Sequence, residues 1–292
     1  MRRKLVRLGG NTLMVSLPAK WAKMHSLSKG DEVYVEQDGE TLSVSPISGS
    51  RLKEISVSYG SEQPARRVFY MPYIRGYDRI SISFTNSSVI SFVEKHLFAL
   101  TGFEILTQKP NSITLQSIIS DNPESFSSVF ERLYNVIISM LHDLAESFRN
   151  GNFEGLQSIA KSESLANKLD FYCRRILHKG MYPNKEMQLS MYNIVRGLES
   201  ITDMIAMHIN SAPQKEFRKE SLMADAMESA ISLLRINHKI LAEAGTTHLD
   251  EVRQEERHFQ ALMKRAKFPH NSLLYSLYHT LHHINEEAVH YK

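Results

Sequence analysis

Two groups of charged residues in this 292-residue chain have the types and the spacing that chemistry needs. The first group is basic, because no acidic residue precedes Asp31 while the stretch before it carries seven cations: Arg2, Arg3, Lys4, Arg7, Lys20, Lys23 and Lys29. The second group is acidic, with Glu199 and Asp203 four residues apart, a spacing that puts both carboxylates on one face of a helix. A block of one charge sign is typical of a protein that binds a phosphate backbone. Paired carboxylates repel each other unless a cation or solvent separates them.

The rest of the chain is nearly balanced in charge, with 35 Lys and Arg against 32 Asp and Glu and a formal net charge of +3. Its length predicts two or three domains, and 42% hydrophobic residues indicate a globular protein. Cys173 is the single cysteine, which excludes an intrachain disulfide and a cysteine-based zinc site. The N-terminus lacks the apolar segment of a signal peptide, and no apolar stretch reaches the roughly 18 residues that a membrane helix needs. We therefore expect a cytoplasmic protein without membrane insertion.

Residues 1–48 have the pattern of a small domain built from hairpins. Its expected elements are strands over 4–8, 12–17, 33–37 and 41–45, a helix over 19–25, and turns at Gly9-Gly10-Asn11 and Asp38-Gly39. About fifty residues with four short strands bury too little apolar surface to be stable alone. Dimerisation through interleaved hairpins is the expected solution.

The segment TLMVSLPAKWAKMHSLSKGDEVYVE, with a basic strand before it and TLSVSP after it, resembles the AbrB/MazE/SpoVT family of swapped-hairpin DNA-binding domains. The resemblance covers about residues 2–46, and its most specific parts are S-L-P-x-x-W and L-x-x-G-D-x-V. It implies a swapped-hairpin β-barrel in a homodimer that presents its basic strands and loops to DNA. The DNA-binding residues it implies are Arg2, Arg3, Lys4, Arg7, Asn11, Lys20 and Lys23, with Arg7 and Asn11 as the candidates for base contact.

Residues 51–118 predict a small central α+β module, for which a ferredoxin-like arrangement fits. The expected strands are 55–59, 79–84, 104–107 and 112–117, and the expected helices are 64–71 and 87–99. Four arginines of this module could bind an anion or could belong to the solvated face of a spacer domain, which is the more common case: Arg66, Arg67, Arg75 and Arg79.

Residues 121–292 predict an all-α domain. Six helices are expected near 123–150, 153–177, 184–210, 217–244, 249–267 and 271–291, and their short connections favour antiparallel neighbours. Two consecutive groups of three helices with comparable lengths suggest an internal repeat. The chain as a whole is thus expected to be a multidomain α+β protein.

The sequence R-x-L-E-x-I-x-D over 196–203 resembles a motif of the PhoU family, whose fold is a pair of three-helix bundles. The resemblance implies a metal, iron or zinc, with Glu199, Asp203, Glu163 and Asp170 as its ligands. Asn167 replaces the acid expected on the second helix, and asparagine is a poorer transition-metal ligand than a carboxylate. In the second repeat, the stretch L-H-H-I-N-E ending at Glu286 takes the place of the motif, with Glu251-x-x-x-Glu255 as the candidate partner. The alternative for all these acids is a polar helix edge without a ligand.

The remaining candidates for chemistry are weak. Glu255-x-x-His258 has no second E-x-x-H to complete a di-iron site, and the cluster His279, His282 and His283 fits metal binding, pH sensing or chance in a chain with 13 histidines. Common nucleotide-binding, metalloprotease and hydrolase motifs do not occur. We expect no enzyme.

The leading hypothesis is a DNA-binding transcriptional regulator that controls phosphate uptake or phosphate metabolism through its PhoU-like domain. Its partners would be DNA, a second copy of the chain through the N-terminal domain, and phosphate-transport components. The alternative is a PhoU-like interaction protein that does not bind DNA and acts on a phosphate transporter or a signalling partner. A metal-dependent bundle enzyme ranks last.

Overall fold

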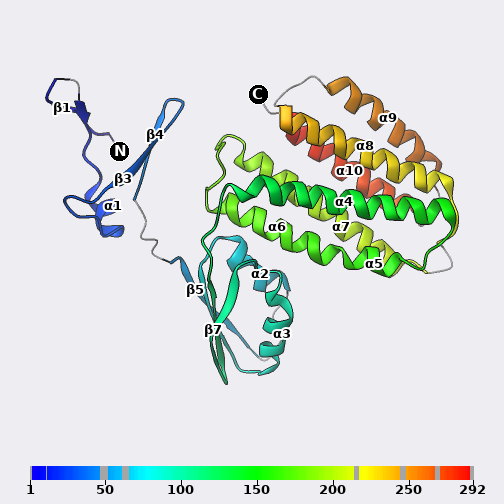
Figure 1. Ribbon diagram of the computed structural model, residues 1–292, viewed down its shortest axis with the longest axis horizontal. Helices are drawn as coiled ribbons and strands as arrows, with labels where there is room; N and C mark the ends of the chain where they lie inside the picture. The colour runs from blue at the N-terminus through cyan, green and yellow to red at the C-terminus, as the bar shows by residue number, and fades with distance from the viewer. Residues whose placement is uncertain are drawn as a thin grey trace. The chain divides into compact units, whose positions relative to one another are not determined.

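The computed structural model describes residues 2–10, 12–46, 52–60, 66–213, 217–243, 248–266 and 270–289. The chain divides into two compact units, Met1–Leu52 and Lys53–Lys292 (Figure 1). The overall class is α+β, as expected, with short strands first, a central sheet next and a helical region last.

The N-terminal unit consists of two hairpins and a short helix. Strand β1 (Val6–Leu8) pairs antiparallel with β2 (Thr12–Met14), and β3 (Val33–Asp38) pairs antiparallel with β4 (Thr41–Pro46), while α1 (Ala19–Met24) lies between the hairpins in sequence. Among the described residues of this unit the strands form two separate two-stranded sheets, so a single chain forms no closed barrel there. None of the side chains described in this unit is buried. The described residues of this unit therefore form no core of their own. Without a core, isolated hairpins are only marginally stable in water.

The second unit begins with a four-stranded sheet. Its elements are β5 (Glu54–Tyr59), α2 (Arg66–Ile74), β6 (Arg79–Phe84), α3 (Ser88–Leu97), β7 (Phe103–Lys109) and β8 (Ser112–Ser117). The strand order is β5-β6-β8-β7, with β5 parallel to β6 and the other two pairs antiparallel. The ferredoxin-like arrangement is therefore wrong, because that fold runs β-α-β-β-α-β whereas here both helices precede the final hairpin.

Alternation along β6 explains how this sheet acquires a core. Ile80, Ile82 and Phe84 are buried, and the serines between them face away from the core. Phe69 and Tyr73 of α2 are buried in the same cluster, which identifies the face of the sheet that the helices cover.

The described part of the chain after the sheet contains the helices α4 (Ser125–Asn150), α5 (Leu156–Lys161), α6 (Glu163–His178), α7 (Gln188–Ser211), α8 (Ser221–Glu243), α9 (Leu249–Arg265) and α10 (His270–Val289) (Figure 1). Helix α4 packs on α8, and α7 packs on α10, so the two successive helix groups share one continuous hydrophobic core. None of the described helices is long and apolar enough to cross a membrane.

The helix expected over 153–177 is broken into α5 and α6. The break falls at Ser162, whose hydroxyl donates to the carbonyl of Ser158 at 3.3 Å, while the Ser164 hydroxyl donates to the carbonyl of Lys161 at 2.9 Å. Serine hydroxyls compete with the helical backbone in this way. The break matters for the site, because α6 starts at Glu163.

Candidate functional site

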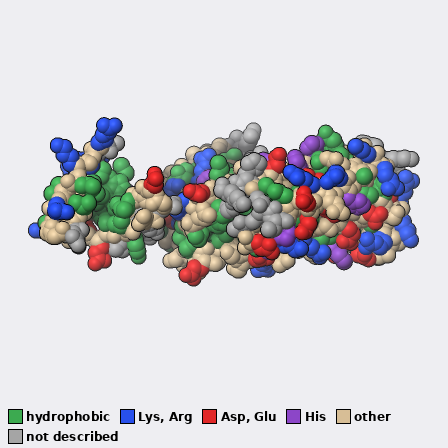
Figure 2. Space-filling model, turned by 90° about the horizontal axis from the view of Figure 1, so that it is seen from above, with side chains coloured by type: hydrophobic (Ala, Val, Ile, Leu, Met, Phe, Trp, Pro, Cys, Tyr) green, Lys and Arg blue, Asp and Glu red, His purple; other side chains and the backbone are tan. Residues whose placement is uncertain are grey.

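The basic residues of the N-terminal unit all lie on its surface. Arg2, Arg3 and Lys4 precede β1, Arg7 lies within β1 opposite Leu13, and Lys20 and Lys23 lie on α1; each of them is exposed. Asn11 lies outside the described residues. Figure 2 shows Lys and Arg side chains on the surface of this unit, at the left of the view.

None of these described cations forms an ion pair with a carboxylate among the residues for which side chains are described. Asp31, the first acid of the chain, accepts a hydrogen bond from the Ser28 amide at 2.7 Å and so stabilises a turn. The positive charge of the unit is therefore available for an external anion such as a phosphate backbone.

Apolar side chains of the same unit are exposed to an unusual degree. Leu5, Leu8, Leu13 and Leu42 each expose more than half of their surface, and Val6 and Val35 do the same. Figure 2 shows hydrophobic side chains gathered at the surface of this unit beside the cations. A patch of this kind marks an interaction surface.

In the second unit, the four acids predicted as metal ligands come together between α6 and α7. Glu163 and Asp170 lie on α6, and Glu199 and Asp203 lie on α7. Their mutual influence is visible in their pKa values. The pKa of Glu163 is raised by burial and then by the charge of Asp203. Burial raises the pKa of Asp170 to about 6. The pKa of Glu199 is raised to about 7 by burial and then by the charge of Asp170.

Arginines and an amide already occupy much of the hydrogen-bonding capacity of these acids. Arg174 donates from Nε to Asp170 Oδ2 at 2.9 Å, and Arg196 donates from Nη1 to Glu199 Oε2 at 2.6 Å. Asn167 Nδ2 donates to Glu163 Oε1 at 3.1 Å. The remaining oxygen of Asp170, Oδ1, is buried and has no hydrogen-bond partner within the described structure.

The charges of Arg174 and Arg196 compensate those of Asp170 and Glu199, and each arginine contacts one carboxylate oxygen. Across the described ranges, no group of three or more His, Cys, Asp or Glu side chains is arranged to hold a metal ion. The Asp170–Arg174 pair has the i, i+4 spacing of a helix ion pair, a signal in the sequence that would have identified it.

The second repeat differs from the predicted arrangement. Glu255 accepts a hydrogen bond from Ser229 of α8 at 2.5 Å, and Glu251 pairs with His248 at 2.9 Å. Glu256 faces α10 instead, where its Oε1 lies 2.9 Å from His282 Nδ1. The prediction that Glu251 and Glu255 are the partners of the α10 motif is therefore wrong, because the acid that the helix turns toward α10 is Glu256.

The four arginines of the central module do not form one anion site. Arg79 pairs with Glu54 at 2.7 Å, while Arg75 is exposed at the end of α2 and its carbonyl accepts a hydrogen bond from Lys53. The side chain of Arg67 lies outside the described set. Arg66 is different, because it lines the space between α2 and the acids of α6.

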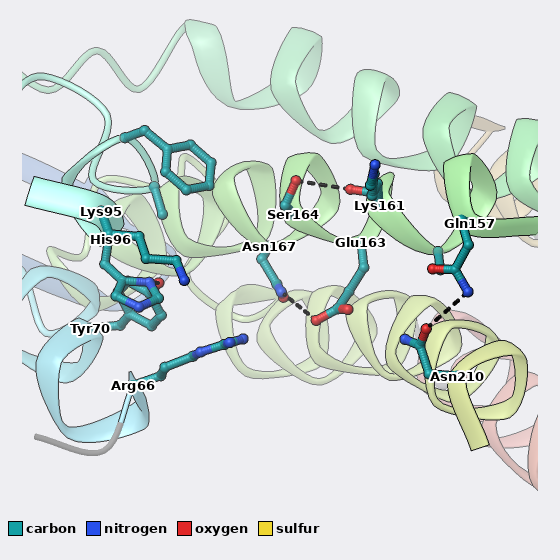
Figure 3. Close-up of a pocket in the computed structure, with 13 residues that line it drawn as sticks. Arg66, Tyr70, Lys95, His96, Gln157, Lys161, Glu163, Ser164, Asn167 and Asn210 are labelled. Atoms are coloured by element: carbon teal, nitrogen blue, oxygen red, sulfur yellow. Dashed lines mark hydrogen bonds between the residues drawn. The ribbon is translucent and has the colours of Figure 1, made fainter. Parts of the chain in front are cut away.

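That space is a groove between the module and the helices. One cavity of about 420 Å³ is lined by α2, α3, α5 and α6, and a second of about 390 Å³ is lined by α2, α6 and α7. The two share Arg66, Tyr70, Glu163 and Asn167, so they are parts of one groove (Figure 3). Sequence reasoning missed this groove, since no local pattern links residues from α2 with residues about a hundred positions later.

Comparison with known proteins identifies two domains. Residues 6–51 match the family model "Antidote-toxin recognition MazE, bacterial antitoxin", and residues 130–209 match the family model of the PhoU domain. No curated protein and no solved structure gives a significant match to the chain. The chain therefore combines a MazE/AbrB-type domain with a PhoU domain, as both resemblances predicted. The first domain suggests a DNA-binding regulator or an antitoxin, and the second suggests phosphate-related regulation.

Proposed function

We propose that this protein is a DNA-binding transcriptional regulator in which two chains join through their N-terminal units and the PhoU-containing unit receives the signal. The observation that carries the proposal is the combination of unpaired cations and exposed apolar side chains on one small unit. In the dimer, the exposed strands would interleave as a swapped-hairpin barrel, burying residues such as Leu13 and Val35. The cations would then lie on a common two-fold surface.

Arg2, Arg3, Lys4, Lys20 and Lys23 would contact phosphates, which supply affinity that depends on salt but carry little sequence information. Arg7 and Asn11 remain the candidates for reading base edges. Because of the PhoU domain, we infer that the regulated process is phosphate uptake or phosphate metabolism. The protein would act in the cytoplasm, where the DNA lies. Phosphate-transport components would be further partners. The protein would act by binding, without catalysis.

The test is a titration of fluorescent duplex DNA by fluorescence anisotropy at several salt concentrations. The variant Arg2→Ala/Arg3→Ala/Arg7→Ala should bind DNA more weakly, and the slope of log affinity against log salt should fall by roughly 0.9 for each phosphate that the protein no longer neutralises. A matched control removes three exposed lysines from the second unit, Lys109→Ala/Lys239→Ala/Lys264→Ala. If the wild type shows no salt-dependent DNA binding, the protein is not a DNA-binding regulator, and if the arginine variant keeps the affinity and salt slope of the wild type, these arginines do not form the DNA surface.

A second candidate function is that of an interaction protein or antitoxin whose N-terminal unit serves only to join chains. The exposed apolar side chains favour it as much as they favour the regulator, because they account for dimerisation without DNA. The cations argue against it, since a surface that only dimerises does not need a block of one charge sign. A dimer that shows no salt-dependent DNA binding would favour this second candidate.

We also propose that the acids between α6 and α7 work without iron or zinc, because Arg174 and Arg196 compensate their charge. Elemental analysis of protein purified without a metal-affinity tag tests this. Iron or zinc at a stoichiometric level would overturn it, and the guanidinium groups would then have to move away from Asp170 and Glu199.

A further inference from the structure

Three cations line the cavity between α2, α3, α5 and α6: Lys161 of α5 and two from the central module. The latter two are Arg66, at the start of α2, and Lys95, near the end of α3, and in the described residues neither forms an ion pair or a hydrogen bond through its charged group. Three arginines near the groove or on the sheet do form ion pairs: Arg174 with Asp170, Arg196 with Glu199 and Arg79 with Glu54. Both side chains, Arg66 and Lys95, are exposed, so an anion that enters the groove can reach them and form charge-assisted hydrogen bonds.

The surroundings of His96 show that Arg66 and Lys95 act at the same point. The pKa of His96 is lowered first by burial, next by the charge of Arg66 and then by that of Lys95. His96 Nδ1 lies 2.7 Å from the Tyr70 hydroxyl, so the two side chains line the cavity together beside these cations. In Figure 3, Lys95 lies beside these rings, Arg66 extends from α2 toward Glu163, and Lys161 lies farther away, beside Ser164.

The size and lining of the groove fit an organic ligand better than a simple ion. Its two cavities, about 420 and 390 Å³, are each within the range of small-molecule sites. Next to Arg66 the lining of the second cavity is aromatic and apolar, with Tyr70, Met71, Ile74 and Phe171. The ring centroids of Tyr70 and Phe171 are 4.5 Å apart. A flat organic group can pack on this surface.

The acidic side chain beside the cations, Glu163, further restricts the kind of ligand that the groove can bind. Glu163 lines both cavities, and Arg66 extends toward it in Figure 3, so an acceptor for N–H donors lies next to the proposed anion position. A phosphoryl group, with a charge of about −1.5 to −2 at pH 7, is attracted more strongly by Arg66 and Lys95 than a carboxylate is, although Glu163 offsets part of the charge of Arg66.

We propose that this groove binds an organic phosphate, with the phosphoryl group on Arg66 and Lys95 and a ring-bearing, N–H-donating part along Tyr70 toward Glu163 and Asn167. The ligand would bridge the central module and the PhoU domain, because α2 and α3 belong to the first and α6 to the helical region that contains the second. That this ligand controls DNA binding rests on the proposed function. That it binds in the groove does not depend on the proposed function.

The experiment is a calorimetric titration of the full-length protein with three probes: AMP, inorganic phosphate and adenosine. AMP should bind more tightly than phosphate, and adenosine should bind more weakly than AMP. The variant Arg66→Ala/Lys95→Ala should lose roughly tenfold or more in AMP affinity for each charged group removed. The control Lys109→Ala/Lys264→Ala, which removes two exposed cations outside the groove, should bind AMP as the wild type does.

Three outcomes would overturn the proposal. If neither AMP nor inorganic phosphate binds at millimolar concentration, the phosphoryl site does not exist. If phosphate binds as tightly as AMP, the organic part of the assignment is wrong. If both double variants lose affinity equally, the binding is unspecific attraction to positive charge.

A separate anisotropy titration with DNA, in the presence and absence of AMP, tests the link to regulation. A protein that binds AMP but not DNA would retain the groove site and lose the proposed function. A protein that binds DNA but neither phosphate probe would lose the groove site alone.

Discussion

Arg175 Nη2 donates a hydrogen bond of 2.6 Å to Asp78 Oδ1, joining α6 to the start of β6 across 97 positions of sequence. The Arg175 side chain is fully buried, and its Nε also donates to Asp121 at 2.8 Å. Its Nη1 donates to the carbonyl of Tyr77 at 2.6 Å, so three segments of the chain meet at one guanidinium. This network fixes the end of α2 relative to α6, and those are the two helices that border the groove.

Breaking this network should destabilise the second unit strongly. Arg175→Met leaves Asp78 and Asp121 without their buried partner, although Lys179 still reaches both, and removal of one member of a buried pair costs about 3–5 kcal/mol. Urea denaturation gives the free energy of unfolding. Arg79→Met is the matched control, because its pair with Glu54 is partly exposed, at 32% and 52% of the two side chains, and should cost less than about 1 kcal/mol. Equal losses in the two variants would contradict the structural role of Arg175.

Patterns within one element could be predicted from the sequence, and contacts between distant elements could not. The alternation of Ile80, Ile82 and Phe84 with serines predicted β6 correctly, because the period of two is local to the strand. The Arg175–Asp78 contact has no such local signal. The ferredoxin-like assignment failed for another reason, because the order strand, helix, strand, helix, strand, strand was predicted and already differs from the β-α-β-β-α-β order of that fold.

The candidate sites likewise contain some contacts with a local sequence signal and others between elements that are distant in the sequence. Helical spacing predicted that Glu199 and Asp203 lie on one face of a helix, because positions four apart lie on one face. Their partners on α6 were implied by the family resemblance. The pairs Asp170–Arg174 and Arg196–Glu199 also have helical spacing, whereas Arg66 and Lys95 come from elements whose packing only the fold determines.

Gly197 permits the close approach of α7 and α10. A Cβ atom at this position would lie 2.6 Å from Ile284 Cγ1, and Ile284 is itself buried. Gly197→Ala should therefore overpack the core and cost about 1–3 kcal/mol, despite the better helix propensity of alanine. The control is Gly155→Ala, where a Cβ atom would meet nothing within 4 Å and the change should be nearly neutral. If thermal unfolding shows Gly197→Ala to be as stable as the wild type, α10 can shift to admit the methyl group.

A charge on the apolar surface of the N-terminal unit should prevent dimerisation. Leu13 is 61% exposed in β2, so Leu13→Asp has little to disturb within one chain but would bury a carboxylate in the proposed dimer interface. Light scattering coupled to size-exclusion chromatography should then report a mass of one chain in place of two. Leu189→Asp is the control, because Leu189 is 71% exposed on α7 and lies in the other unit. A monomeric wild type, or two dimeric variants, would speak against an interface formed by the strands.

His208 should make the protein lose stability in mild acid. Its Nε2 lies 2.9 Å from His270 Nδ1 next to Phe217, and burial, followed by the charge of His270, lowers the pKa of His208 to about 4. Between this value and the ordinary pKa of about 6.5, the unfolded chain binds more protons than the folded chain, so stability is present above pH 6.5 and is lost as the pH falls. The loss attributable to His208 should be on the order of 2 kcal/mol between pH 7 and pH 5.

The acids between α6 and α7 act in the opposite direction, since the raised pKa of Glu199 favours the folded state as the pH falls through about 7. The effect of His208 must therefore be measured as a difference between proteins. His208→Gln keeps a hydrogen-bonding side chain opposite His270 but does not titrate. Its free energy of unfolding should fall less than that of the wild type from pH 7 to pH 5, whereas His258→Gln, which removes an exposed histidine of α9, should follow the wild type. Parallel profiles for the wild type and His208→Gln would mean that the buried histidine pair tolerates a proton, for example by opening the aromatic surroundings of His208 to water.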